Sequence, residues 1–195
     1  MAAIDDVLAD RLLSAVSEQL GREGERWEIV VIGGAALATL GLVARTTADI
    51  DVVGLRHGAL ITPADPLPES LRRARDRVAR DFGLDRDWLN AQAADVVRLG
   101  LPEGFADRVE TRGYPPNLKV HFAGRYDLIH LKLHALVDRG PGGKHDADLR
   151  ALHPTEEELL AAGRWAMTHD PSPGFRQILG EALRYLGVED AALGA

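Results

Sequence analysis

The spacing of apolar residues predicts helices that alternate with short strands in the first third of the chain. Residues 4–20 carry apolar side chains at helical intervals, which predicts an amphipathic helix packed on a core. Residues 28–32 form a short run rich in β-branched side chains that stops at two glycines, as is typical of a buried strand. Small, helix-favouring residues follow over 35–40, and residues 49–53 predict a second strand. This pattern predicts an α/β fold.

The remaining pattern predicts more helices and one further pair of strands. These elements are helices over 68–82, 85–97, 127–139 and 175–186, a helical stretch from residue 154, and strands over 105–111 and 118–123. Asp127 is expected to cap the helix that follows it, and Thr155 with Glu158 is expected to form a capping box. Residues 187–195 are expected to fray, as chain ends commonly do.

Composition and charge narrow the class of protein. The chain has 195 residues with 46% hydrophobic and 27% charged residues, which suits one core or a core with a small helical appendage. It has no cysteine, and so no disulfide or thiolate chemistry. No apolar run is long enough to span a bilayer, and the first residues are acidic where a signal peptide is basic, so a cytoplasmic protein is expected. The net charge of −7 disfavours broad nonspecific nucleic-acid binding.

The candidate chemistry lies at the glycines after the first predicted strand. Gly33 and Gly34 permit positive φ and let a ligand approach the backbone, and a helix that opens there directs free N–H groups at an anion such as phosphate. Asp49 and Asp51 lie two residues apart and so on one face of the second strand. Such a pair can hold Mg²⁺ while the turn holds phosphates. The glycine pair alone is commonly a plain turn, and the aspartate pair alone is commonly two solvated carboxylates.

In this order and spacing the residues resemble the DNA polymerase β-like nucleotidyltransferase superfamily. They are similar in particular to its minimal bacterial branch, which includes the AbiEii-type toxins of toxin–antitoxin pairs. The matching stretches are GGAAL at 33–37 and RTTADID at 45–51. The candidate phosphate-binding residues are Gly33, Gly34, Arg45 and Thr47. Arg45 can fork onto phosphate oxygens or form a salt bridge to the aspartates, and Thr47 can bind a phosphate or cap local backbone.

A second stretch, over residues 127–149, resembles the second motif of the same branch. In that branch a lysine on one helix and a carboxylate on the next complete the active site, and the matching residues are Lys132 and Asp148. Asp146 is the close competitor, but Asp148 is preferred because a leucine follows it, as in the family pattern. The alternative for Lys132 is a surface lysine whose stem lies along apolar neighbours.

The superfamily also takes a third carboxylate from a later strand, and here the sequence departs from the pattern. Asp107 and Glu110 are the acidic residues of the expected strands, but they differ in side-chain parity and lie in no recognisable motif. The departure weakens the case for a mechanism with two metals.

The helix predicted over 68–82 is rich in arginine. Arg73, Arg77 and Arg80 fall on one side of it. They form either a solvated face paired with aspartates of the same helix, or a rim that guides a polyanion such as tRNA.

The sequence therefore predicts a nucleotidyltransferase-like domain over residues 1–153, with a mixed sheet flanked by helices, and a helical extension packed on it over 154–195. The resemblance implies a Mg²⁺-dependent enzyme that transfers a nucleoside monophosphate from an NTP to an acceptor hydroxyl. It implies the 3′ end of tRNA or a protein as acceptor, and an antitoxin protein as a partner. The competing hypothesis is a nucleotide-binding or protein-interaction module that keeps the fold without turnover.

Overall fold

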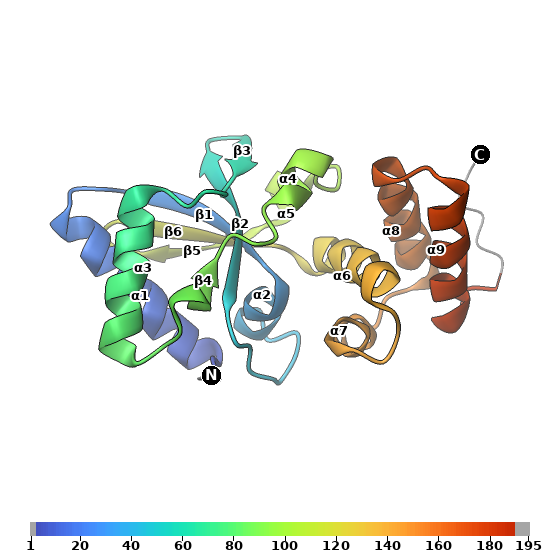
Figure 1. Cartoon of the computed structure of the whole chain (residues 1–195), viewed down its shortest axis with the longest axis horizontal. Helices are drawn as coiled ribbons and strands as arrows, with labels where there is room; N and C mark the ends of the chain where they lie inside the picture. Colours follow the sequence, from blue (N-terminus) through green and yellow to red (C-terminus); the bar gives the residue numbers. More distant parts are fainter. Residues whose placement is uncertain (1–2, 190–195) are drawn as a thin grey trace. The chain divides into compact units, whose positions relative to one another are not determined.

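A computed structural model describes residues 3–189 and divides the chain into two compact units, Met1–Gly124 and Arg125–Ala195 (Figure 1). The boundary expected after residue 153 lies inside the second unit, and the division into a catalytic domain and an extension at that point stays a prediction. Of the segment expected to fray, residues 190–195 lie outside the described residues. Val188 is buried, so the fraying does not begin at residue 187.

The first unit is built around one mixed sheet. Its elements are α1 (Asp6–Arg22), β1 (Trp27–Ile32), α2 (Gly33–Thr39), β2 (Ile50–His57), β3 (Leu60–Pro63), α3 (Glu69–Phe82), the 3₁₀ turn η1 (Arg86–Trp88), β4 (Leu89–Asn90), α4 (Asp95–Leu99), α5 (Phe105–Arg108), β5 (Glu110–Tyr114) and β6 (Leu118–Phe122). In the described part of the chain the six strands run in the order β3-β2-β1-β6-β5, and β4 pairs with β2 beside this path. β1 is antiparallel to β2 and parallel to β6. The predicted mixed α/β class is confirmed.

The two long helices of this unit pack on the sheet. α1 and α3 lie beside each other and beside the strands (Figure 1). The Trp27 indole on β1 donates to the Ser70 hydroxyl of α3 at 3.0 Å, and the Ser17 hydroxyl of α1 donates to the Tyr114 carbonyl at 2.6 Å. Burying the apolar stripe of each helix against β-branched residues of the central strands drives this packing.

Two expected elements of this unit are wrong. Residues 85–97 form no single helix, because Leu89 and Asn90 extend to pair with Ile50 and Asp51 of β2, and a helix resumes only at Asp95. Residues 105–108 are a short helix where a strand was expected, and the strand β5 begins only at Glu110. The expected pairing of the last two strands is confirmed, since β5 and β6 are antiparallel.

The second unit is helical, with α6 (Arg125–Arg139), α7 (Lys144–Ala151), α8 (Glu156–His169) and α9 (Pro173–Tyr185). α6 packs against the other three helices. The capping box of Thr155 and Glu158 is confirmed at the start of α8. Asp127 is not the cap of α6, because the helix begins two residues earlier and buries Asp127 in its first turn. Among the described residues, no helix is long and apolar enough to cross a membrane.

Candidate functional site

The glycine turn lies directly against one of the two candidate carboxylates. β1 ends at Ile32, whose register partner on β2 is Asp51, and α2 begins at Gly33 with φ of +74°. A Cβ atom at Gly33 would lie 2.5 Å from Asp51 Oδ2. Glycine is required here both by the backbone angle and by the close approach of the carboxylate.

The other residues predicted to bind phosphate gather at the same turn. A Cβ atom at Gly34 would lie 2.7 Å from Thr47 Oγ1 and 3.6 Å from Arg45 Nη2. Arg45 also donates through Nη1 to the Thr46 carbonyl at 3.1 Å. The Thr47 hydroxyl lies 3.4 Å from Asp49 Oδ1, so it joins the glycine turn to the second candidate carboxylate. The loop before β2 thus brings a guanidinium and a hydroxyl to the turn.

Asn90, to which the sequence assigned no role, contacts the second carboxylate oxygen of Asp49. Asn90 is 4% exposed and lies on β4, where it pairs with Asp51 of β2. Its Nδ2 lies 3.4 Å from Asp49 Oδ2 and 3.3 Å from the Asp87 carbonyl, and its Oδ1 accepts from the Gln92 N–H at 3.0 Å. Asn90 was missed because its strand has two residues and was expected to be helical. The sequence signal was weak, since only the pairing with β2 defines β4.

The donor set of Asp49 and Asp51 fits a magnesium ion that arrives with a nucleotide. Both carboxylates are half-buried, and Mg²⁺ is usually held by one or two carboxylates together with substrate phosphates. Within residues 3–189, no group of three or more His, Asp or Glu side chains is placed to hold a metal. Asp107 is exposed on α5, and Glu110 is exposed on β5 beside Arg112 at 3.7 Å. The described residues thus offer two carboxylates that would hold a Mg²⁺ ion here, with its remaining ligands left to a bound nucleotide.

In the second unit the two residues of the second motif form a buried ion pair. Lys132 Nζ lies 2.6 Å from Asp148 Oδ2, and the two side chains are 6% and 1% exposed. The competitor Asp146 makes other bonds, to Arg150 Nε at 2.8 Å, the Gly142 N–H at 2.9 Å and the Tyr185 hydroxyl at 2.7 Å. The Tyr185 hydrogen bond is the main cause that lowers the Asp146 pKa. Asp146 therefore links the loop between α6 and α7 to α9 by hydrogen bonds, whereas Asp148 forms the ion pair with Lys132.

A histidine beside this pair is held neutral. Burial, followed by the positive charge of Lys132, lowers the pKa of His145 to about 4. Within the described part of the chain its Nδ1 is buried without a hydrogen-bond partner. Any charge placed on the imidazole at neutral pH would be desolvated and close to a like charge, so His145 stays uncharged there.

A family model matches residues 10–141 of the chain, and the family is described as nucleotidyltransferase of unknown function (DUF6036). The chain belongs to this family. The match includes the glycine turn, Asp49 and Asp51, Asn90 and Lys132, and it ends before Asp148. Searches of curated proteins and of solved structures found no match.

Family membership confirms the coarse prediction of a nucleotidyltransferase and implies an NTP as substrate. The family description names no acceptor and no toxin activity, so the AbiEii-like assignment is not confirmed by it.

Proposed function

We propose that this protein transfers a nucleoside monophosphate from an NTP to an acceptor hydroxyl and releases pyrophosphate. The observation that carries the proposal is the packing of the Asp51 carboxylate against the glycine turn at Gly33. A turn that accepts phosphate oxygens beside two carboxylates at the start of one strand is suited to phosphoryl chemistry, because phosphate binding and charge neutralisation then take place next to each other.

Each residue near the turn has a role in this proposal. The backbone of Gly33 and Gly34 holds the β- and γ-phosphates, and Arg45 and Thr47 bind phosphate oxygens beside them. Asp49 and Asp51 would hold a Mg²⁺ ion, which when bound would supply positive charge against the charge that develops on the α-phosphate. The acceptor oxygen forms the new bond to the α-phosphorus, the bond from that phosphorus to the bridging oxygen breaks, and Asp51 takes the proton of the acceptor hydroxyl.

Lys132 and Asp148 belong to the proposal through the second motif. By resemblance to that motif, Lys132 would contribute a positive charge for a phosphate oxygen, and Asp148, which lies 2.6 Å from its Nζ, would orient it. A Lys132→Met variant that keeps full transfer activity would remove both residues from the catalytic set while leaving the glycine turn and the aspartates in it.

The likeness of residues 33–37 and 45–51 to AbiEii-type toxins supports a finer proposal, that the protein is the toxin of a toxin–antitoxin pair. On this proposal it acts on the 3′ end of tRNA or on a protein hydroxyl, and an antitoxin protein binds it. Expression that arrests growth in the native protein but not in an Asp51→Asn variant would support the toxin role. Normal growth with an active enzyme would contradict it.

One observation favours a second candidate, a nucleotide-binding module without turnover. The described residues provide two carboxylates at the turn where the superfamily uses three. This candidate predicts that NTP binds with Mg²⁺ but that no label is transferred.

The deciding experiment incubates the protein with each α-labelled NTP, Mg²⁺ and either total RNA or lysate protein. Asp51→Asn is the test variant, and Asp81→Asn, which removes an exposed carboxylate at the end of α3, is the matched control. The proposal expects transfer by the native protein and by the control, with loss in Asp51→Asn. A γ-labelled NTP must transfer nothing, because that phosphate leaves as pyrophosphate. Transfer that survives in Asp51→Asn refutes the proposal, and binding without transfer selects the second candidate.

A further inference from the structure

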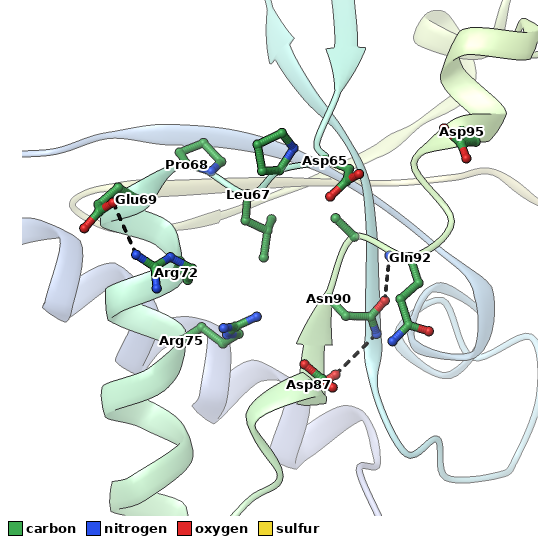
Figure 2. A pocket seen from close by; sticks show the side chains of 12 residues that line it. Asp65, Leu67, Pro68, Glu69, Arg72, Arg75, Asp87, Asn90, Gln92 and Asp95 are labelled. Atoms are coloured by element: carbon green, nitrogen blue, oxygen red, sulfur yellow. Dashed lines mark hydrogen bonds and ion pairs between the residues drawn. The ribbon is translucent and has the colours of Figure 1, made fainter.

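A cavity of about 770 Å³ adjoins the candidate site (Figure 2). Its walls come from the loop after β3, the first turns of α3, and the segment from η1 through β4 to the start of α4. In Figure 2, Arg72 and Arg75 extend from α3 on one side, and Asp87, Asn90 and Gln92 lie on the other. Asn90 belongs both to this cavity and to the carboxylate pair, because its amide contacts Asp49. The cavity therefore opens beside the atoms at which the proposed chemistry takes place.

The strand order places the cavity and the glycine turn on opposite sides of β2. On one side of β2, β1 ends at the glycine turn, where Gly33 meets Asp51. On the other side, β4 presents Asn90 to Asp49. In an in-line displacement the attacking and leaving oxygens lie on opposite sides of the phosphorus. If pyrophosphate leaves toward the glycine turn, the acceptor hydroxyl attacks from the side of β4, which is where this cavity lies.

The charge of the lining disfavours a polyanion. Four carboxylates line the cavity against two guanidinium groups. Both guanidinium groups are already paired, Arg72 with Glu69 at 3.2 Å and Arg75 with Asp76 at 2.8 Å.

Both arginines of the lining form ion pairs, but not all four carboxylates do. Asp95 pairs with Arg98, but among residues 3–189 neither Asp65 nor Asp87 makes an ion pair. Both are exposed at the cavity. Unpaired carboxylates attract cationic groups and repel phosphates.

Two of the three arginines on one side of α3 are also already paired with a carboxylate, and the third, the exposed Arg80, lies outside the cavity lining. Arg73 and Arg77 both bind Glu23, at 2.7 and 2.8 Å. A nucleic-acid phosphate would have to displace that carboxylate before it could use either guanidinium.

We infer that this cavity is the acceptor subsite, and that the acceptor is a peptide segment in which a hydroxyl side chain is flanked by basic residues. The inference rests on the proposed nucleotidyl transfer. The hydroxyl lies next to Asn90 and the carboxylate pair, and the flanking cations meet Asp65 and Asp87. It selects a protein over the 3′ end of tRNA as the acceptor.

The test measures binding of defined probes to the whole protein by amide NMR. Three nine-residue peptides carry one central serine, flanked by arginines, by glutamines or by glutamates, and the fourth probe is an RNA oligonucleotide that ends in CCA. The arginine peptide should bind most tightly and shift the amide signals of Asn90, Gln92 and Asp95. An Asp65→Asn/Asp87→Asn variant should weaken its binding about fivefold, as expected for two exposed charges.

A control variant with the same loss of charge, Asp81→Asn/Glu103→Gln, removes exposed carboxylates outside the cavity lining and should bind the arginine peptide as the native protein does. Equal weakening in both variants would show only general charge attraction and would overturn the inference. Tighter binding of RNA or of the glutamate peptide at these amides, or no shift with any probe, would overturn it as well.

Titration of the same samples with NTP and Mg²⁺, read at the amides of Gly33, Gly34 and Thr47, tests the donor side separately. Peptide binding without NTP binding would contradict the proposed function and leave the cavity a peptide site. NTP binding without peptide binding would contradict the subsite alone.

Discussion

Replacing Lys132 by methionine should lower the free energy of unfolding by about 3–5 kcal/mol, the usual cost of removing one partner of a buried ion pair. The pair is short, at 2.6 Å, and its side chains are 6% and 1% exposed. The substitution leaves the Asp148 carboxylate in the interior without its ammonium group, and little water reaches it there. Most of the loss is therefore the desolvation of the remaining charge and not the attraction that was removed.

The reverse substitution and the double variant separate these contributions. Asp148→Leu should cost a similar amount, because it leaves the lysine charge buried instead. The double variant Lys132→Met/Asp148→Leu buries no charge of this pair, and apolar replacement of a whole buried ion pair is often neutral or stabilising. We therefore expect the double variant to be more stable than either single variant.

Urea unfolding followed by circular dichroism measures these differences. Arg139→Met is the matched control, because Arg139 lies on the same helix and pairs with Asp138 at 3.1 Å, but the two side chains are 75% and 69% exposed. An exposed pair contributes about 0–1 kcal/mol, so this control should stay close to the native protein. A Lys132→Met variant no less stable than Arg139→Met would refute the reasoning. A stable double variant that still transfers nucleotide would refute only the catalytic role of Lys132.

Three further predictions concern single residues. Gly33→Ala should abolish transfer in the labelling assay, because the new Cβ atom meets Asp51. The control Gly24→Ala also has a positive φ, +72°, but open space around it, so it should keep activity and lose only about 1 kcal/mol of stability to backbone strain. Because the folded pKa of His145 lies below its unfolded value, at about 4, the native protein should lose roughly 1–2 kcal/mol of stability as the pH falls from 6.5 toward 4. A His145→Gln variant should lose less in urea unfolding at pH 7 and 4.5, and an equal loss would contradict this account. Asn90→Asp adds a negative charge beside Asp49, so the acidic limb of the pH–rate profile for transfer should move to higher pH, and an unchanged profile would show that residue 90 does not act on Asp49.

The parts of the site that were predictable from sequence are those that local chemistry defines. A β-branched run followed by two glycines strongly favours a strand that ends at the glycines, which is what β1 does. The second strand begins at Ile50, one residue later than expected, so Asp49 lies just before β2 and Asp51 within it. The close contact of Gly33 with Asp51 follows from the pairing of two strands that the pattern already identified. Lys132 and Asp148 were singled out by the resemblance of residues 127–149 to a family motif and not by local chemistry, and the structure shows that they form an ion pair.

The parts that were missed depend on contacts between distant segments. The apolar residues between Asp85 and Val97 are compatible with helical spacing, and only hydrogen bonding to β2 makes Leu89 and Asn90 a strand. Intrinsic preference cannot identify a strand of two residues, because its stability comes from its neighbour. The strand predicted over residues 105–108 was wrong for a related reason, because Gly104 adopts a left-handed conformation and a short helix starts after it, before the strand begins.

The amide of Asn90 changes the surroundings of the two candidate carboxylates, Asp49 and Asp51. A third carboxylate beside Asp51 would add repulsion to a pair already two residues apart, whereas the Asn90 amide donates toward Asp49 Oδ2 while the Thr47 hydroxyl lies near its other oxygen. Asp49 thus has neutral donors near both of its carboxylate oxygens, and the Asp51 carboxylate lies close against Gly33. Under the proposed function, the same division would put the leaving phosphates beside Gly33 and the attacking hydroxyl beside Asn90, on opposite sides of β2. An asparagine at this position therefore fits a site that depends on the nucleotide for part of its metal shell and on the neighbouring cavity for its acceptor.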